Sequence, residues 1–245
     1  MLTLRWYIWN ETKQTIEMLN RSIASFQRFL NGYGPVRYVI AADNRDWVGK
    51  RLRVRVDEIF SNREGPFCVP IGCFRKLSPR LRMFGGTEIL IDLDIFCVRE
   101  PTHLFHFLEN PEFKGIIQSR KTGSASRLGY GYWADKIAAG VPPCCYGFLG
   151  MKEGYDFTAK LLPLMEETAR MPANWFNDQG AVVKAMEDDI LDHSICLLTE
   201  EGIRYFTPKN YPVDLDRLDT EMLHCISGYS TRYRCYKKLL KRGLI

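Results

Sequence analysis

Apolar residues at the start of the chain fall into blocks that predict a strand, a helix and a second strand. Residues 2–9 are apolar and aromatic, as in a buried strand, and residues 36–42 form a similar run that stops at Asp43. Between them, apolar residues recur on one helical face: Ile16, Leu19, Ile23, Phe26 and Leu30. Asn10-Glu11-Thr12 offers a polar cap for this helix. Two strands joined by a helix predict a parallel pair, and hence an α/β fold.

The segment 88–99 contains a short strand that ends at two acidic residues. The Ile-Leu-Ile run at 89–91 follows a glycine pair and fits a strand covered on both faces. Asp92 and Asp94 come next, and ligands of open α/β sheets bind at the carboxyl ends of strands. Two carboxylates in an Asp-x-Asp arrangement can share one hard divalent cation, which commonly keeps substrate phosphates in its shell. This pattern predicts a metal–diphosphate site at the mouth of the sheet.

A second Asp-x-Asp, formed by Asp214 and Asp216, serves as an internal comparison. It follows Tyr211-Pro212 and runs into Arg217, with no apolar strand in front of it. We therefore expect a solvated turn or a helix start there. The strand before the first copy makes Asp92 and Asp94 the candidate metal ligands.

The rest of the chain continues the alternation of strands and helices. Apolar runs predict strands at 113–118, 195–198 and 222–226, and another around Tyr146. An amphipathic pattern predicts a helix at 156–171.

The sequence pattern predicts the secondary structure of two segments less clearly. Residues 54–60 are ambiguous, and residues 67–70 are a candidate third strand. Residues 73–83 are a candidate helix that Pro79 would kink.

The candidate helix at 73–83 is rich in basic residues. It carries Arg75, Lys76, Arg80 and Arg82. An ammonium group is a point-charge partner for phosphate, and a guanidinium group can bind phosphate bidentately. A solvated basic face is the alternative interpretation of this segment.

Composition and charge describe an ordinary globular chain with a mild basic excess. The chain has 245 residues, a length suited to one large α/β domain, and a formal net charge of +5. The arginines cluster locally, as in segment 50–55, and do not form a tail. This balance suits an anionic ligand such as a nucleotide diphosphate and gives no argument for nucleic acid.

The eight cysteines follow neither a disulfide framework nor a zinc pattern. The shortest spacings are Cys68-x4-Cys73 and the adjacent pair Cys144-Cys145. We find no signal peptide and no apolar run of about 18 residues, so we expect reduced thiols, no transmembrane segment and a cytoplasmic protein.

Several motifs, taken in order, resemble the GT-A glycosyltransferases, and among them the family-eight-like nucleotide-sugar transferases. The resemblance begins with Lys76-Leu77, the strand that ends in Asp92 and Asp94, and the short segment of Pro101 and Leu104-Phe105. It continues with the run Cys145-Tyr-Gly-Phe-Leu-Gly150, with Trp175-Phe-Asn-Asp178-Gln-Gly180, and with His224 near the end. The resemblance covers most of the chain. It implies a GT-A fold with a mixed, mostly parallel central sheet flanked by helices.

The resemblance also implies an organisation and a set of ligands. One domain would span 1–245, with a nucleotide-binding half at about 1–100 and an acceptor half at about 101–245. Asp92, Asp94 and His224 would hold Mn2+ or Mg2+. The nucleotide-sugar donor would contact Trp9, Asn10, Asp43, Lys76, Arg82 and Leu93.

Some of these residues have structural interpretations that stay open. Trp9 and Asn10 could be core edge and helix cap, and a lone histidine such as His224 is often a satisfied core residue. The basic tail after Ser227-Gly228 replaces the Lys-Pro-Trp more common in the family. That difference leaves the phosphate contact from this end of the chain open.

Asp178 is the candidate catalytic residue, and it too has a structural alternative. In an inverting enzyme it would take the proton of the acceptor hydroxyl as general base. In a retaining enzyme it would orient the acceptor or stabilise positive charge on the sugar. Asn177 or Asp178 could equally cap the helix that begins here.

The sequence therefore predicts a metal-dependent glycosyltransferase of the hexosyltransferase type. It would move a sugar from a nucleotide-diphosphate donor, with UDP-sugar expected, to a hydroxyl acceptor such as a glycan. A sugar-nucleotide pyrophosphorylase is the enzymatic alternative, but the loop at 9–12 lacks the glycine-rich, Arg- and Lys-containing sequence usual there. A non-catalytic nucleotide- or carbohydrate-binding module is the other alternative.

Overall fold

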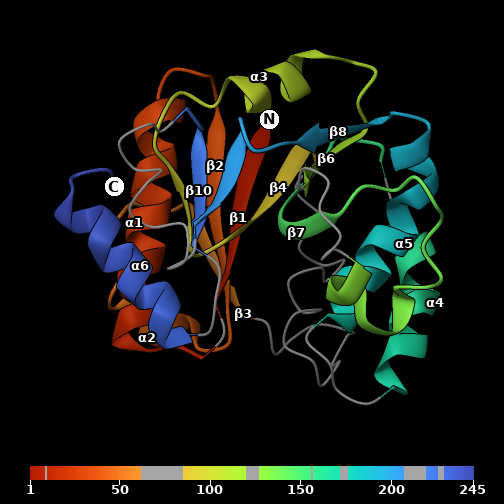
Figure 1. Cartoon of the computed structure of the whole chain (residues 1–245). Coiled ribbons are helices and arrows are strands. Elements are labelled where there is room, and N and C mark those ends of the chain that lie inside the picture. Colours follow the sequence, from red (N-terminus) through yellow and green to blue (C-terminus); the bar gives the residue numbers. More distant parts are fainter. Residues whose placement is uncertain are drawn as a thin grey trace.

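A seven-stranded mixed sheet forms the centre of the computed structural model, which describes residues 1–8, 10–61, 85–119, 127–155, 157–171, 176–206, 219–225 and 229–245 (Figure 1). The strand order is β3-β2-β1-β4-β7-β6-β8. The strands are β1 (Leu2–Ile8), β2 (Val36–Ala42), β3 (Glu58–Ser61), β4 (Thr87–Asp92), β6 (Gly115–Ser119), β7 (Cys144–Met151) and β8 (Ile195–Leu198). Neighbouring strands are parallel except where β7 is involved. The predicted mixed, mostly parallel α/β sheet is confirmed.

The opening strand–helix–strand unit forms as its sequence pattern predicts. β1 and β2 pair in parallel. Helix α1 (Lys13–Leu30) begins after Thr12, whose hydroxyl accepts a hydrogen bond from the Thr15 backbone N–H, while the Thr15 hydroxyl accepts from the Thr12 N–H. These reciprocal bonds give partners to backbone groups that a helix start otherwise leaves without any. The predicted apolar face is buried at every position: Ile16, Leu19, Ile23, Phe26 and Leu30.

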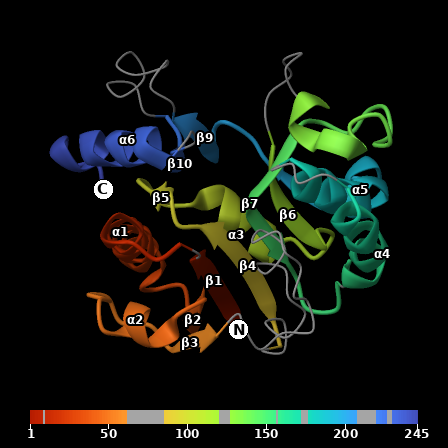
Figure 2. The same ribbon diagram turned by 90° about the horizontal axis from the view of Figure 1, so that it is seen from below.

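Two hydrophobic cores lie on opposite faces of the large sheet. Successive strand residues point to opposite faces. Ile89 and Ile91 of β4 join the core that contains the buried face of α1, whereas Leu90 joins the core that contains residues of α4 (Thr158–Ala169) and α5 (Asn177–Leu191). Figure 2 shows α1 on one side of the sheet and α4 and α5 on the other. The continuous apolar run in β4 follows from this burial on both faces.

A second sheet of three strands adjoins the carboxyl end of β4. Its order is β5-β10-β9, with β5 (Ile95–Cys97), β9 (Ile203–Phe206) and β10 (Met222–Cys225). β10 is antiparallel to β5 and parallel to β9. β4 ends at Asp92 and β5 starts at Ile95, so the first Asp-x-Asp spans the passage from one sheet to the other.

The remaining helices within the described residues are short or lie at the periphery. α2 (Arg45–Gly49) and α3 (Thr102–Glu109) follow strands of the large and the small sheet, and η4 (Arg127–Trp133) packs against α5. The C-terminal helix α6 (Tyr229–Lys241) lies beside α1 (Figure 1). The interval that the sequence left ambiguous contains β3, whereas the candidate strand at 67–70 and the candidate basic helix at 73–83 lie outside the described residues.

Glu17 of α1 anchors the C-terminal helix. The hydroxyls of Tyr233 and Tyr236 donate to its carboxylate at 2.6 and 3.0 Å, and the Lys237 ammonium lies 3.0 Å from it. Burial raises the pKa of Glu17, but these hydrogen bonds outweigh burial, and the pKa is lowered overall. A lowered pKa means that this anchor contributes stability above the ordinary pKa of glutamate and loses it as the pH falls.

The start of α5 differs from the predicted cap. The residue that precedes the helix is Phe176, and its side chain makes no capping hydrogen bond. Asn177 Oδ1 instead accepts the backbone N–H of Tyr132 at 2.9 Å, which joins α5 to η4. Asp178 Oδ1 accepts the N–H of Gln179 at 2.7 Å inside the first turn. The structure does not support Asn177 as the capping residue, because a tertiary contact takes its side chain, whereas Asp178 provides an acceptor for one N–H of the first turn.

The cysteines in the described part of the chain are free thiols. They are Cys97, Cys144, Cys145, Cys196, Cys225 and Cys235. Burial raises the pKa of Cys144 to about 12 and that of Cys196 to about 11. Such thiols stay protonated and weakly reactive at neutral pH. Cys68 and Cys73 lie outside the described residues.

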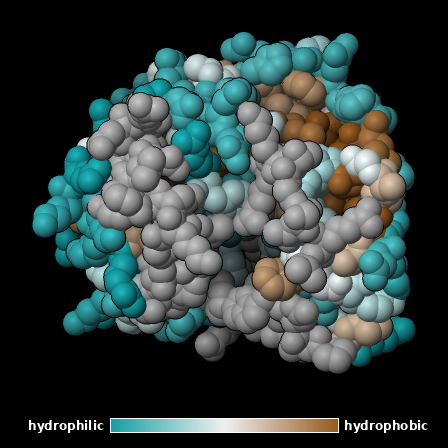
Figure 3. Space-filling model, in the orientation of Figure 1, coloured by the Kyte–Doolittle hydropathy of each residue, from teal (hydrophilic) through white to brown (hydrophobic). Residues whose placement is uncertain are grey.

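The described surface is mostly polar. In Figure 3, hydrophilic side chains cover most of the described part of this face, and hydrophobic side chains gather in one area at its upper right. The exposed large hydrophobic residues within the described ranges are Met1, Phe176 and Leu191. None of the helices in these ranges has both the length and the apolar character that crossing a membrane requires.

Gly180 allows close packing between α5 and η4 and provides a test of this fold. A Cβ atom at Gly180 would lie 2.3 Å from the Tyr130 carbonyl oxygen and 2.8 Å from Trp133 Cβ. We expect Gly180→Ala to destabilise the protein by about 2 kcal/mol through overpacking, which lowers the melting temperature by roughly 4–8 °C. Gly49→Ala in α2 is the matched control, because its Cβ would meet Ile59 Cδ1 at an ordinary 3.5 Å. Equal melting temperatures for the two variants would contradict the packing argument.

Candidate functional site

Asp92 and Asp94 lie where the two sheets meet. The Asp92 side chain is 38% exposed, whereas that of Asp94 is 2% exposed. The backbone carbonyl of Asp94 accepts the N–H of Cys225 at 2.9 Å, which ties the acidic turn to β10. One carboxylate therefore faces solvent, and the other is fixed between the two sheets.

His224 reaches the acidic pair because β10 lies beside β5. In this antiparallel pair His224 is opposite Ile95, the residue that follows Asp94. His224 Nε2 lies 3.6 Å from Asp94 Oδ1 and 4.0 Å from Asp92 Oδ2. The imidazole is 3% exposed and stacks on Tyr205 with ring centroids 5.3 Å apart. The three residues that the sequence suggested as metal ligands are thus brought together.

Gln118, at the end of β6, sets the orientation of the imidazole. Its buried Oε1 accepts a hydrogen bond from His224 Nδ1 at 2.8 Å. A neutral imidazole whose Nδ1 donates this bond has its lone pair on Nε2, the nitrogen that faces the two carboxylates. A hydrogen bond of this kind fixes the tautomer and ring orientation of metal-binding histidines.

A bulge in β7 brings a glycine against two of these residues, His224 and Asp92. The pairing of β6 with β7 shifts from Ile117↔Leu149 to Gln118↔Cys145, which leaves residues 146–148 bulged. A Cβ atom at Gly147 would lie 2.5 Å from His224 Cε1 and 2.9 Å from Asp92 Oδ2. Any larger residue at this position would fill the space between the imidazole and Asp92.

The three side chains fit a divalent cation. Their ligand atoms lie within 4.8 Å of one another, in the only group of this kind within the described part of the chain. Two ligands of one octahedral cation, each at about 2.1 Å, are roughly 3–4 Å apart. Two carboxylates and one neutral imidazole form a mixed oxygen and nitrogen set, which suits Mn2+ and also allows Mg2+.

Arg232 of α6 also reaches the acidic pair. Its Nε lies 2.8 Å from Asp94 Oδ2, and its side chain is 34% exposed. Asp94 therefore presents Oδ1 to His224 and Oδ2 to Arg232. The sequence indicated a basic tail after His224 but gave no role to this arginine.

Asp178 lies in a buried polar contact on the other side of the β7 bulge. It is 1% exposed, and its Oδ2 accepts a hydrogen bond from the hydroxyl of Tyr146. Its Oδ1 accepts from Gln179 N–H. Tyr146 immediately precedes Gly147, so one short bulged segment lies against Asp92 and His224 and also contacts the candidate catalytic residue.

Asn10 and Asp43 lie at the same edge of the large sheet. Ile8, Ala42 and Asp92 are the last residues of three neighbouring parallel strands. Asn10 is exposed and has φ 59°, a left-handed conformation that asparagine tolerates better than most residues. The two loops are joined by Glu11, whose carboxylate accepts the N–H of Asn44 at 2.7 Å.

Of the other residues predicted to contact the donor, the structure describes only Leu93. The side chain of Leu93 is buried in the core and does not face solvent. Trp9, Lys76 and Arg82 lie outside the described residues.

Sequence reasoning missed four residues of the site: Gln118, Tyr146, Gly147 and Arg232. Tyr146 and Gly147 lie in the strand motif at 145–150, and Gln118 ends a predicted strand, so each was near a recognised signal. The contacts of Gln118, Tyr146 and Gly147 depend on a bulge, and that of Arg232 depends on the position of α6; neither leaves a clear mark in one sequence.

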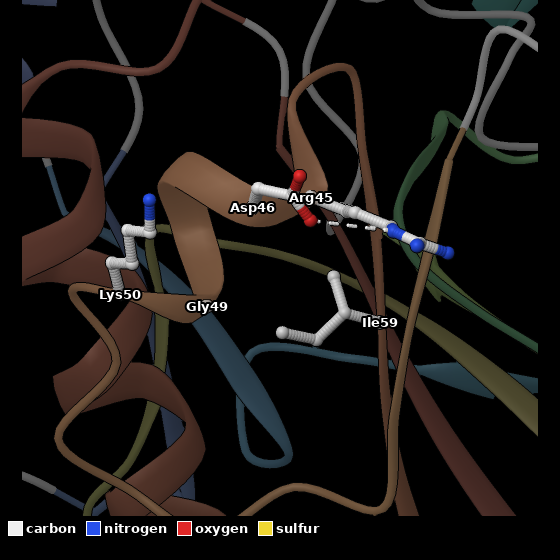
Figure 4. Close-up of a pocket in the computed structure, with 5 residues that line it drawn as sticks. All are labelled: Arg45, Asp46, Gly49, Lys50 and Ile59. Carbon is white, nitrogen blue, oxygen red and sulfur yellow. Dashed lines mark ion pairs between the residues drawn. The ribbon is translucent and has the colours of Figure 1, made fainter.

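A shallow hollow lies between α2 and the edge strand β3. Arg45, Asp46, Gly49, Lys50 and Ile59 line it (Figure 4). Arg45 Nε lies 3.5 Å from Asp46 Oδ1, and both side chains are largely exposed. None of the predicted site residues lines this hollow, so we do not assign it to the site.

Comparison with solved structures identifies the fold. Galactosyltransferase LgtC, in complex with donor and acceptor sugar analogs, aligns over 100% of both chains with a TM-score of 0.58 and 12% identity. Mouse xyloside xylosyltransferase 1 in its apo form aligns over 94% of this chain and 98% of its own, with a TM-score of 0.57 and 9% identity.

A third structure agrees with these two. It is a glycosyltransferase involved in glycosylation of the major capsid of PBCV-1, which aligns over 97% of this chain and 98% of its own, with a TM-score of 0.51 and 12% identity. No protein-family model matches the sequence, and neither does any curated protein. The chain has the fold of the GT-A glycosyltransferases, and the predicted resemblance to that class is confirmed at the level of fold.

Gln118 provides a direct test of the proposed ligand geometry. Gln118→Met keeps the volume but removes the acceptor that orients His224. We expect Mn2+ affinity, measured by titration calorimetry without nucleotide, to fall about 10–100-fold, as for other partners of metal-binding histidines. Gln27→Met on the surface of α1 is the control and should bind Mn2+ as the wild type does. Unchanged affinity in Gln118→Met would contradict the assignment of His224 Nε2 as a ligand.

Proposed function

We propose that this protein is a divalent-cation-dependent glycosyltransferase that uses a nucleotide-diphosphate sugar. The observation that carries the proposal is the convergence of Asp92, Asp94 and His224 at the carboxyl edge of a GT-A sheet. UDP-sugar is the expected donor, and the acceptor is a hydroxyl group of a glycan or another molecule. The three structural neighbours, each a glycosyltransferase, support the same class of reaction.

Asp92, Asp94 and His224 would hold Mn2+ or Mg2+ at this edge. A cation there would neutralise the charge that grows on the diphosphate as the sugar–phosphate bond breaks. The ligand set carries two negative charges and one neutral nitrogen, with the nitrogen lone pair oriented by Gln118. These features suit a site that binds the cation together with an anionic diphosphate.

The loops after β1 and β2 are proposed to bind the nucleoside part of the donor. Asn10 and Asp43 follow two neighbouring parallel strands and lie at the same sheet edge as Asp92. Ligands of open α/β sheets bind in this position. Lys76 and Arg82 are proposed from the sequence alone as phosphate contacts.

Asp178 is proposed to act on the acceptor side of the donor. Both of its oxygens accept hydrogen bonds from the protein, and these bonds fix the orientation of the carboxylate. An oriented carboxylate can accept the proton of an acceptor hydroxyl or hold that hydroxyl in place. The two roles differ in whether the charge on Asp178 is required.

The first test of the function concerns Asp94. We expect Asp94→Asn to bind Mn2+ weakly and to lose metal-dependent release of UDP from UDP-sugars, because one of the two anionic ligands is gone. The measurement is UDP release across a panel of UDP-sugars, with and without Mn2+. Asp46→Asn, at an 80% exposed carboxylate, is the control and should be fully active. Full activity in a folded Asp94→Asn variant would reject the site.

The same assay separates the proposed function from its two alternatives. A sugar-nucleotide pyrophosphorylase would consume pyrophosphate and form a sugar phosphate, and would release no UDP. A binding module would retain the donor without turnover.

The second test concerns Asp178. Asparagine can still accept the Gln179 N–H with its carbonyl oxygen and can donate its amide N–H to the Tyr146 hydroxyl oxygen. We therefore expect Asp178→Asn to keep the melting temperature and UDP binding but to lose sugar transfer by about 100-fold or more, the usual contribution of such a group.

Asp188→Asn, an 81% exposed carboxylate on the same helix, is the matched control and should transfer sugar normally. Near-normal transfer by Asp178→Asn would exclude a base and leave a role in positioning. A large fall in its melting temperature would show that the charge of Asp178 is structural.

A further inference from the structure

Arg232 forms an ion pair with one of the two carboxylate oxygens of Asp94. Its Nε lies 2.8 Å from Asp94 Oδ2, while Asp94 Oδ1 lies 3.6 Å from His224 Nε2. One oxygen of this 2% exposed carboxylate is thus paired with a fixed positive charge, and the other faces the candidate cation position.

The arginine is held in place by the helix that carries it. α6 buries Cys235, Tyr236 and Leu239, and its tyrosines and Lys237 bind Glu17 of α1. In Figure 2, α6 lies beside β10, the strand of His224. The guanidinium is therefore a permanent charge of this site.

The positive charge of Arg232 reduces the net negative charge that a divalent cation meets at this site. Asp92 and Asp94 together carry two negative charges, and Arg232 offsets one of them. The affinity of a carboxylate site for a divalent cation follows the number of its charged ligands and its rigidity. A guanidinium on Asp94 therefore weakens cation binding to the free protein. A diphosphate adds negative charge that attracts both the cation and the arginine, which is 34% exposed.

We propose that Arg232 couples the two ligands: it keeps the affinity of the free protein for Mn2+ low and makes tight cation binding depend on a bound diphosphate. The inference rests on the proposed function and adds an order of assembly to it, in which cation and diphosphate bind as a pair. The coupling is reciprocal, so the cation must tighten diphosphate binding by the same factor.

The coupling is measured as a ratio of Mn2+ affinities, with and without anion, in the 245-residue chain. Mn2+ dissociation constants are determined by electron paramagnetic resonance of free Mn2+, without nucleotide, with UDP and with inorganic pyrophosphate. The wild type should bind Mn2+ more tightly with either anion. In Arg232→Gln, which loses the charge but keeps a polar N–H group, Mn2+ affinity without anion should rise about tenfold. The ratio of affinities with and without UDP should fall by a similar factor.

Two further variants separate charge from position. Arg232→Lys keeps the positive charge and should retain most of the coupling. Arg234→Gln removes a charge from an exposed position two residues further along α6 and should bind both ligands as the wild type does. Thermal melting checks each fold, and Arg232→Met, which keeps the apolar stem, replaces Arg232→Gln if the latter does not fold.

The outcomes distinguish this inference from the proposed function. If Arg232→Gln binds Mn2+ without anion more weakly than the wild type, or equally well, the inference is overturned, whereas the proposed function is tested separately by Mn2+-dependent release of UDP from UDP-sugars by the wild type. If pyrophosphate shows the coupling and UDP does not, the role of Arg232 stands and the nucleotide donor is rejected.

Discussion

The pairing of β10 with β5 is the interaction on which the site depends. It places His224 opposite Ile95 and ties Cys225 N–H to the carbonyl of Asp94 at 2.9 Å. Strand side chains alternate between the two faces of a sheet, so a shift of one residue would turn His224 away from the acidic pair and place Leu223 there instead. The register of three strand residues in a small sheet therefore decides whether the metal ligands meet.

The bulge of β7 is the second constraint, and it joins the two halves of the site. β7 is the antiparallel strand within an otherwise parallel sheet, and its pairing with β6 is interrupted beside the acidic turn. This interruption lets Gly147 approach His224 and Asp92 while Tyr146 reaches Asp178. Bulges commonly redirect side chains next to functional sites. Here one bulge supports both the cation position and the candidate catalytic carboxylate.

The fold persists although few residues are shared with its structural neighbours. Identities of 9–12% accompany alignments over at least 94% of this chain. A sheet buried on both faces needs apolar residues of suitable volume in the right pattern, and many sequences satisfy this requirement. The chemistry of a site requires particular residues at particular places, so the proposed function depends on the acidic pair and His224 rather than on the fold alone.

The sequence by itself determined the elements and the local motif. Strands buried on both faces, such as β4, are continuous apolar runs in the sequence, and the apolar residues of α1 recur with helical spacing. The local sequence pattern was therefore enough to predict both elements. Asp92 and Asp94 could be recognised because the strand that presents them directly precedes them. Tertiary structure alone decided the rest. His224 and Arg232 reach the acidic pair through strand register and helix docking, and Gln118 reaches His224 beside a bulge. All three depend on contacts between residues far apart in sequence. The misassigned cap at Asn177 has the same cause, because its side chain binds Tyr132, 45 residues away.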